Sequence, residues 1–282
     1  MAGPQNRARL LRARKLEAQP PSHCLGQPMQ KFPRPTLVIS RCLELTPCRY
    51  DGARVPFDFI NHLLPHVKLL PVCPEVEIGL GTPREPIRLI RPGSATLLLQ
   101  PKTGARLTRK MRSFAKEYLA GISTADGFIL KSRSPSCGIR DTKIFPNLHA
   151  THPIDKGAGL FAEAVLTKFG HLAIEDEARL TSPANREHFL SKLFTLAAFR
   201  ALKKSPTPRK LARFHDEYSP LLAAHSPKEG ATLAEIAHKF TDIDKRLPAY
   251  EAHLRLALAR PVPKARRGRY EPPFPKGLTL PL

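Results

Sequence analysis

The stretch Thr36-Leu37-Val38-Ile39-Ser40-Arg41-Cys42 joins a short run of apolar, β-branched residues to a cysteine. A run of this kind is typical of a buried strand. The same pattern returns twice further along the chain. Residues 67–72 run directly into Cys73, and residues 127–131 run into a Ser- and Pro-rich loop that carries Cys137. Each of three predicted strands is therefore followed by a cysteine.

Regions with helical spacing separate these strands at 56–64 and 107–120, and a further one follows the third strand at 159–168. Short extended segments are also expected at 87–90 and 96–100. The alternation of strand and helix predicts an α/β fold, with a mainly parallel sheet and helices on both faces. In an open parallel sheet, the ligand crevice lies beyond the carboxyl ends of the strands. We therefore expect Cys42, Cys73 and Cys137 to meet at one edge of this sheet.

The chain changes character after Gly170, where we find helical signals and no strand signal. Apolar spacing predicts helices at 183–202, 209–218 and 233–259. A small all-α domain is therefore expected to follow the sheet. The predicted order is a basic N-terminal tail over 1–35, an α/β domain over 36–172, a helical domain over 175–258, and a basic Pro-rich tail over 259–282.

The charge of the chain indicates an anionic partner, since its formal net charge is +22 over 282 residues. More than half of this excess lies in residues 1–35 and 255–282. Such tails can be solvated without a specific role, or can capture nucleic acid by neutralising phosphates. The first tail could also be an organelle-targeting leader. No apolar run is long enough for a membrane-spanning helix, and no secretory leader is recognisable, so we expect a cytoplasmic protein.

The cysteines are the best candidates for chemistry. The five cysteines include no Cys-X-X-Cys pair, which removes the usual zinc-ribbon and ferredoxin patterns. Cys42, Cys73 and Cys137 together suit a four-iron cluster held at three corners, with one iron open. Two alternatives stand beside this one: each cysteine is a small buried apolar residue, or Cys48 completes a four-cysteine zinc site. Cys24 falls in the first tail and is not expected to take part.

Polar residues next to these cysteines are candidate catalytic groups. Glu75 follows Cys73 by two positions and could move protons there, or it could simply pair with an arginine. Ser134 precedes Cys137 by three positions, and its hydroxyl could orient water or substrate, or could form the turn that Ser-Pro favours. Tyr50 and Asp51 lie before a glycine, so they form either a turn or a usable pair on the rim of the site.

The residues around the cysteines resemble the bacterial thiouracil desulfidase family. The matching segments are Ser40-Arg41-Cys42-Leu43, Arg49-Tyr50-Asp51-Gly52, 71–81, 83–89 and 127–138. The helical part is similar to an accessory domain fused behind that domain, through Phe214-His215 and 221–227. The two-domain order resembles the tRNA 4-thiouridine desulfidase type. Beyond about Lys239 the resemblance stops, so we expect the helical domain to be truncated or diverged there.

The resemblance implies a [4Fe–4S] cluster held by Cys42, Cys73 and Cys137, with one open iron. The thiocarbonyl sulfur of the substrate would bind that iron, and water would replace it at the ring carbon. Glu75 becomes the candidate general acid/base and Ser134 the group that positions substrate or water. The residues expected to bind the substrate are Tyr50, Asp51, Arg84 and Ser132.

The implied partner is thiolated tRNA, and no membrane is expected. The first alternative is an enzyme of the same chemistry that acts on free thiouracil-type bases. The second is a basic RNA-binding protein with a structural four-cysteine zinc. The cysteine at position 48 departs from the family pattern, where we expect a residue that is not a ligand. A fourth-ligand role and a redox role for Cys48 both remain open at the level of the sequence.

Overall fold

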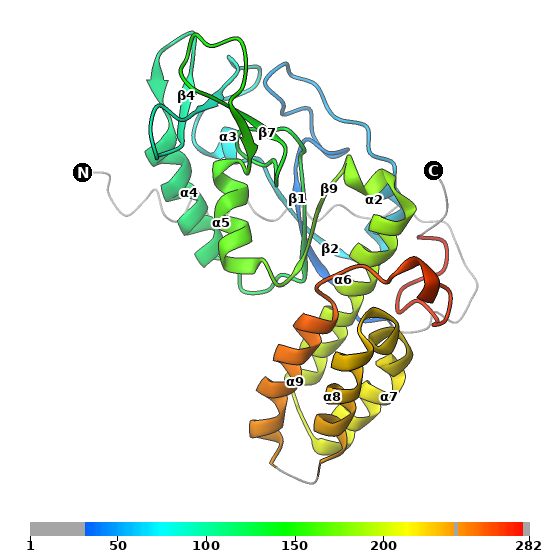
Figure 1. The fold of residues 1–282 in the computed structure, drawn as a ribbon. Helices are drawn as coiled ribbons and strands as arrows, with labels where there is room; N and C mark the ends of the chain where they lie inside the picture. Colours follow the sequence, from blue (N-terminus) through cyan, green and yellow to red (C-terminus); the bar gives the residue numbers. More distant parts are fainter. Residues whose placement is uncertain (1–31, 240–241, 279–282) are drawn as a thin grey trace, which may run out of the picture. The chain divides into compact units, whose positions relative to one another are not determined.

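The computed structural model describes residues 32–239 and 242–278. The basic segment expected over 1–35 lies outside the described residues up to position 31, as does Cys24. The sheet built by the strand–cysteine repeats has four strands in the order β2-β1-β6-β9, all parallel. Their bounds are Lys68–Val72 for β2, Thr36–Ser40 for β1, Gly127–Leu130 for β6 and Ala173–Asp176 for β9. The prediction of an α/β fold with a parallel sheet is confirmed (Figure 1).

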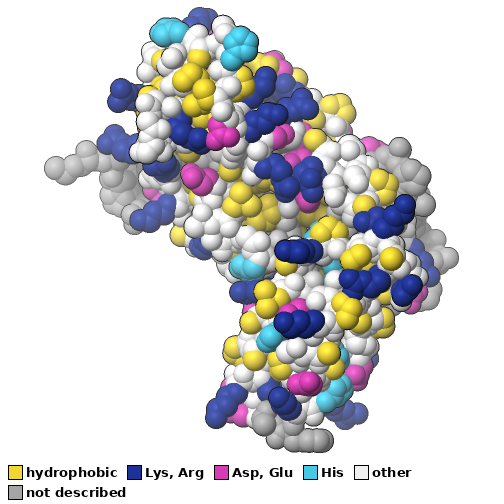
Figure 2. Space-filling view, viewed as in Figure 1, with side chains coloured by type: hydrophobic (Ala, Val, Ile, Leu, Met, Phe, Trp, Pro, Cys, Tyr) yellow, Lys and Arg dark blue, Asp and Glu magenta, His cyan; other side chains and the backbone are white. Residues whose placement is uncertain are grey.

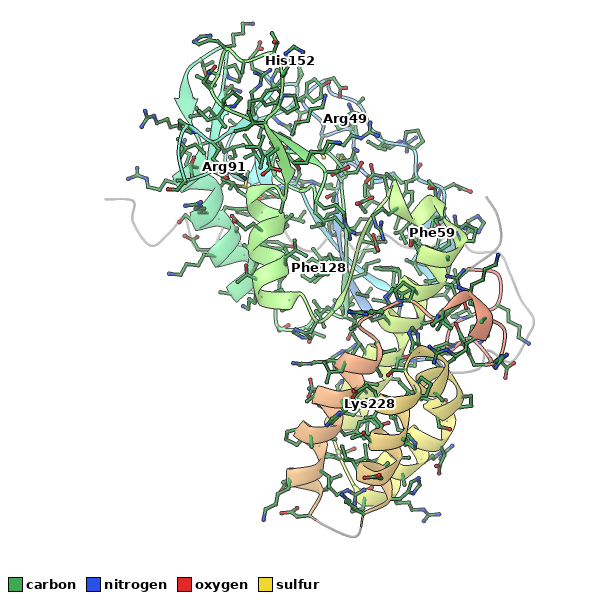
Figure 3. The ribbon with its side chains drawn as sticks, viewed as in Figure 1. Arg49, Phe59, Arg91, Phe128, His152 and Lys228 are labelled. Carbon is green, nitrogen blue, oxygen red and sulfur yellow. The ribbon has the colours of Figure 1, made fainter. Side chains whose placement is uncertain are left out.

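Helices cover both faces of this sheet, because successive side chains of a strand point to opposite faces. Val38 of β1 packs with residues of α4 (Thr108–Ala120) and α5 (Leu160–Phe169). Its neighbours Leu37 and Ile39 pack instead with α2 (Phe59–Leu63) and α6 (Pro183–Lys203). Figure 3 shows Phe128 of β6 on the α5 side, where its ring lies 5.3 Å from that of Phe169.

The fourth strand of the sheet corrects the expectation that no strand follows Gly170. Residues Ala173–Asp176 form β9, which pairs with β6. The two acidic residues of β9, Glu175 and Asp176, interrupt the apolar pattern by which a buried strand is recognised in the sequence. Both are buried and paired locally: Glu175 binds the guanidinium of Arg179, with Oε2 and Nε 2.8 Å apart, and Asp176 accepts the Arg179 backbone N–H. A carboxylate with such a partner is tolerated inside a fold that would otherwise exclude it.

A second sheet, which the sequence did not predict as a unit, has five short strands in the order β5-β4-β3-β7-β8. The extended segments expected at 87–90 and 96–100 are its strands β3 and β4. All its pairs are antiparallel except β3 with β7. The bounds are Arg88–Ile90 for β3, Leu97–Gln100 for β4, Ala105–Arg106 for β5, Thr142–Phe145 for β7 and Asp155–Gly157 for β8.

The helical region that follows β9 consists of α6, α7 (Pro208–His225), α8 (Pro227–His238) and α9 (Ile243–Ala257). The helix expected at 209–218 is longer than predicted, and the one expected at 233–259 is two helices. Thr207 and Ser226 cap α7 and α8 by accepting a backbone N–H, and each is followed by a proline in the first turn. Among the described residues, no helix has the length and apolar character needed to cross a membrane.

Helix α6 belongs to both parts of the fold. Its Leu190 and Phe194 pack on the parallel sheet, while Phe199 stacks against Tyr250 of α9 with ring centroids 5.6 Å apart. Arg200 then forms an ion pair with Asp126 just before β6, with both oxygen–nitrogen distances at 2.8 Å. The core is therefore continuous from the sheet into the helices.

The Pro-rich segment at the end of the chain is partly packed. A solvated tail was expected over 259–282, of which the structure describes residues up to 278. In that part Val262, Phe274 and Leu278 are buried, and Phe274 lies 6.3 Å from the ring of Phe194. A few apolar side chains among prolines are enough to hold such a segment against α6, because apolar burial is favourable in any secondary structure.

Candidate active site

Three cysteines meet at the carboxyl edge of the parallel sheet, as the strand order requires. Strands β2, β1 and β6 are neighbours and run in the same direction, so their carboxyl ends share one edge. Cys73 follows β2 at once, Cys42 lies two residues beyond β1, and Cys137 lies on the loop after β6. All three are buried and carry free thiols. The thiols of Cys73 and Cys137 are close enough to interact electrostatically.

Cys48 joins this group, although no spacing pattern in the sequence places it beside the other three cysteines. Its buried thiol is within hydrogen-bonding reach of the thiols of both Cys42 and Cys73, and its carbonyl oxygen lies 3.7 Å from Cys73 Sγ. The contact with Cys42 is the largest cause that raises the pKa of Cys48. Four thiols therefore gather at one edge, three from strand ends and one from the loop after β1.

The loop that carries Cys137 is held by Ser134. The Ser134 hydroxyl accepts the backbone N–H groups of Ser136 and Cys137, at 3.2 and 3.1 Å. The loop is too tight for a side chain at Gly138, where an added Cβ would lie 2.2 Å from Thr142 Oγ1. The hydroxyl of Ser134 thus positions the Cys137 backbone, which is the turn-forming role that the Ser-Pro pair suggests.

Glu75 lies in α3 (Pro74–Glu77), the short helix that begins directly after Cys73. Its Oε1 accepts hydrogen bonds from the hydroxyls of Ser134 and Ser136, at 3.3 and 3.0 Å. It is near enough to the thiols of Cys73 and Cys137 to act electrostatically on both. The structure therefore brings the predicted acid/base residue to the cysteines. Ser136 is not among the residues predicted from the sequence, although its place next to Cys137 in a Ser-Pro-Ser-Cys loop is a recognisable signal.

Arg84 holds the other oxygen of Glu75. Its Nη2 lies 2.7 Å from Glu75 Oε2, and its Nη1 donates to the carbonyl oxygens of Cys48 and Gly81, at 3.0 and 2.9 Å. The side chain is only 4% exposed. Its guanidinium, expected to bind substrate, is thus engaged within the protein and joins the Glu75 helix to the Cys48 loop.

Tyr50 and Asp51 lie on the exposed loop that follows Cys48. The Tyr50 carbonyl accepts the backbone N–H of Arg84 at 2.8 Å, which ties this loop to the buried network. Tyr50 is 45% exposed, and the guanidinium of Arg49 lies 5.6 Å from the centre of its ring. Asp51 forms an ion pair with Arg49 at 3.0 Å. The Tyr50 ring is therefore available to a planar ligand, while Asp51 shapes the turn.

Ser132 is hydrogen-bonded to Glu177, and not to Glu75 as Ser134 and Arg84 are. Its buried hydroxyl donates to Glu177 Oε1 at 2.7 Å, and its backbone N–H donates to Glu177 Oε2 at 2.8 Å. Lys131 completes this group with an ion pair to Glu177 at 2.5 Å. Glu177, which the sequence analysis did not identify, follows β9 and so fixes the start of the loop after β6. Among the described residues, the Ser132 side chain makes its hydrogen bonds within this network and none with Glu75 or Arg84.

The thiols of Cys73 and Cys137 must lose their protons before they can bind a metal centre. The hydrogen bond with Cys48, followed by burial, raises the pKa of Cys73, and burial raises the pKa of Cys137. Metal binding displaces such protons, because the thiolate is the ligand. Among the described residues, no three or more His, Cys, Asp or Glu side chains are grouped so as to hold a single ion.

Comparison with known proteins places the site in a family context. A family model described as 2-thiouracil desulfurase matches residues 37–177, which is half of the chain and spans all four thiols. A curated relative, the uncharacterized protein YbbK of Bacillus subtilis strain 168, is 32% identical over 109 residues. That alignment covers 36% of this chain and 72% of the relative.

A solved structure is also similar to part of the chain. It is described as a [4Fe-4S]-dependent thiouracil desulfidase, TudS, and is 26% identical in sequence. The match covers 52% of this chain and 93% of that one, with a TM-score of 0.41. The placement of the chain in a family rests on the family model and on the curated relative.

Proposed function

Because the chain belongs to the 2-thiouracil desulfurase family, we propose that it is an iron–sulfur-dependent desulfidase that converts 4-thiouridine in tRNA to uridine. The reaction replaces a thiocarbonyl sulfur by the oxygen of one water molecule and releases hydrogen sulfide. Carbon keeps its oxidation state, so no oxidant or reductant is consumed. The single observation that carries the proposal is the meeting of Cys42, Cys73 and Cys137 beside Glu75.

Cys42, Cys73 and Cys137 are the proposed ligands of a [4Fe–4S] cluster with one open iron. The residues fit this group, since three free, buried thiols follow the carboxyl ends of neighbouring parallel strands. When bound, the cluster would supply a sulfur-seeking metal position that distinguishes a thiolated base from uracil. Cys48 is proposed to remain a thiol, because a fourth protein ligand would close the iron position that the substrate sulfur needs.

Glu75 is proposed to move the proton of the attacking water. Its Oε1 already accepts from Ser134 and Ser136, so the carboxylate is fixed in one orientation toward the loop of Cys137. A carboxylate held in this way can take a proton from water and return it to the departing sulfur. Ser134 and Ser136 then act as positioning groups, with Ser134 also fixing the backbone of Cys137.

Arg84 is proposed to orient Glu75 and shape the substrate side of the site. It binds Glu75 through one oxygen and leaves Oε1 for the serine hydroxyls. It also reaches the loop of Cys48 and Tyr50 through carbonyl and backbone contacts. Tyr50, with its exposed ring, is proposed to stack on the substrate base, and Asp51 to hold that loop through Arg49.

Thiolated tRNA is the proposed substrate because the chain is strongly basic. A net charge of +22 matches a polyphosphate better than it matches a neutral free base. The free-base reading has the support of the family description, so it is the second candidate. The sulfide released from thiolated bulk tRNA, compared with that from free thiouracil by the same reconstituted protein, decides between them.

The expected result is faster sulfide release from tRNA than from thiouracil at equal concentrations of thiolated base. Faster release from thiouracil would favour the free-base enzyme. A protein that binds zinc in place of iron, binds tRNA and releases sulfide from neither substrate would support the RNA-binding alternative. The experiment requires anaerobic reconstitution, followed by iron and zinc analysis of the same sample.

A further inference from the structure

The outward face of α4 carries a group of basic residues. Four of them lie in the helix and one in β5, directly before it: Arg106, Arg109, Lys110, Arg112 and Lys116. All five side chains are exposed. The buried residues of α4 lie on its opposite side, where Met111, Ala115 and Leu119 pack into the core. We call these five residues the α4 cationic face. Figure 2 shows Lys and Arg side chains over the part of the surface where α4 lies.

The α4 cationic face has no acidic partner. Within the described parts of the chain, none of its five residues forms an ion pair. The acidic residue nearest to Lys116 in α4 is Glu117, and its carboxylate accepts a hydrogen bond from Ser113 at 3.0 Å. Lys203 and Lys210, at the basic junction of α6 and α7, are engaged instead with Glu251 and Ser205. Among the described residues, the α4 cationic face is thus a basic surface without compensating carboxylates.

This arrangement works against the stability of α4. Arg109 and Arg112 are three positions apart, and Arg112 and Lys116 are four apart, so like charges stand next to one another on the helix. Arg109 and Lys110 also lie in the first turn, where the helix dipole disfavours positive charge. The first turn of α4 holds no acidic residue. Packing therefore does not explain these residues, and an anionic partner does.

The face lies beside the cysteine edge of the sheet. Helix α4 contacts α3, which begins directly after Cys73 and carries Glu75. After Ala120 the chain turns into β6, so α4 runs opposite to the parallel strands and its first turns lie toward their carboxyl ends. Arg109 and Arg112 are therefore at the end of the helix nearest the proposed catalytic residues.

We propose that the α4 cationic face binds the phosphate backbone of tRNA next to the thiolated base. The proposal rests on the proposed function and adds the docking surface for the same substrate. RNA is favoured over other anions because, under the proposed function, the thiolated base is one nucleotide of a phosphate-linked strand. Contacts spaced along about 10 Å of helix, from Arg109 to Lys116, can meet more than one phosphate of a strand.

The test uses the full chain with three charge reversals, Arg109→Glu, Arg112→Glu and Lys116→Glu. Binding of thiolated tRNA is measured by fluorescence anisotropy at several salt concentrations. We expect the Kd for tRNA to rise at least about tenfold at moderate salt, and the slope of log K against log salt to become shallower by roughly two to three. Sulfide release from 4-thiouridine nucleoside should be unchanged, because no changed residue touches the cysteine site.

The matched control reverses three exposed lysines in the helical region, Lys228→Glu, Lys239→Glu and Lys245→Glu, with the same change in net charge. We expect the control to bind tRNA with nearly the wild-type salt slope. A control that loses as much affinity as the α4 variant would overturn the proposal, since net charge would then explain the effect. Glutamine replacements of the three α4 residues should show a smaller loss in the same direction, with unchanged thermal unfolding.

The two proposals fail in different ways. If the wild-type protein binds tRNA through α4 but releases sulfide from no thiolated substrate, the proposed function fails and the docking surface stands. If it releases sulfide from tRNA, and the α4 variant binds tRNA as tightly as wild type, the docking surface fails and the proposed function stands.

Discussion

The hydroxyl of Ser136 donates a hydrogen bond to Glu75, with its Oγ 3.0 Å from Glu75 Oε1. The two residues come from different strand ends, Glu75 from the helix after β2 and Ser136 from the loop after β6. Ser136 is fully buried and directly precedes Cys137. One hydrogen bond therefore couples the proposed acid/base to the backbone that carries a proposed cluster ligand. A change in the position of Glu75 should therefore alter the conformation of the Cys137 loop.

Replacing Glu75 by Gln should abolish most of the activity and leave the cluster in place. The amide cannot take a proton from water, so turnover of thiolated tRNA should fall by about 100-fold or more. Iron content and visible absorbance should match those of the wild type, because Glu75 is not a proposed ligand. Sulfide release at the wild-type rate would remove Glu75 from the mechanism.

Replacing Cys42, Cys73 or Cys137 by Ala should each prevent assembly of the cluster. Wild type should hold about four irons per chain after anaerobic reconstitution, whereas each variant should lose iron and activity together. Cys48→Ser is the matched control, since it removes a thiol from the same edge without removing a proposed ligand. Loss of iron in the Cys48 variant would show a fourth protein ligand and no open position.

Asp126→Asn should destabilise the protein without changing the cysteine site. Asp126 accepts the backbone N–H of Thr36 at 2.7 Å and binds Arg200 through both oxygens, so it ties β1 to α6. Loss of these charge-assisted bonds should lower the free energy of unfolding by about 2–3 kcal/mol. Urea unfolding of the wild-type and variant apo-proteins measures this difference. A change below about 0.5 kcal/mol would contradict this role, as surface substitutions commonly reach that size.

The stability of the folded chain should fall as the pH drops below 6.5, in part through His188. Burial lowers the pKa of His188 from 6.5 to about 3, so the folded state does not take up the proton that the unfolded state binds. Each pH unit in this window costs at most about 1.4 kcal/mol. His188→Asn should flatten the decline in urea midpoint between pH 6.5 and 4.5. The exposed His149→Asn serves as the control, and an equal flattening there would contradict the assignment.

The parallel sheet was predictable because its signal is local. Apolar runs such as Thr36–Ser40 and Gly127–Leu130 predict buried strands. The helices between the strands indicate crossover connections, which join parallel strands. The shared edge of the cysteines follows from that topology alone. Strand β9 was not predicted because Glu175 and Asp176 interrupt its apolar pattern. Burial of Glu175 is tolerated because it pairs with Arg179, and this pairing is recognised only in the folded chain.

The sequence by itself determined three buried strands, the cysteines at their carboxyl ends and the candidate acid at Glu75, because these depend on spacing along one chain. The tertiary structure decided which groups touch. It placed Cys48 among the other thiols, turned Arg84 inward onto Glu75, and gave Ser132 to Glu177. These contacts depend on how separate loops and helices meet in three dimensions, and no local pattern encodes the direction in which a side chain finds its partner.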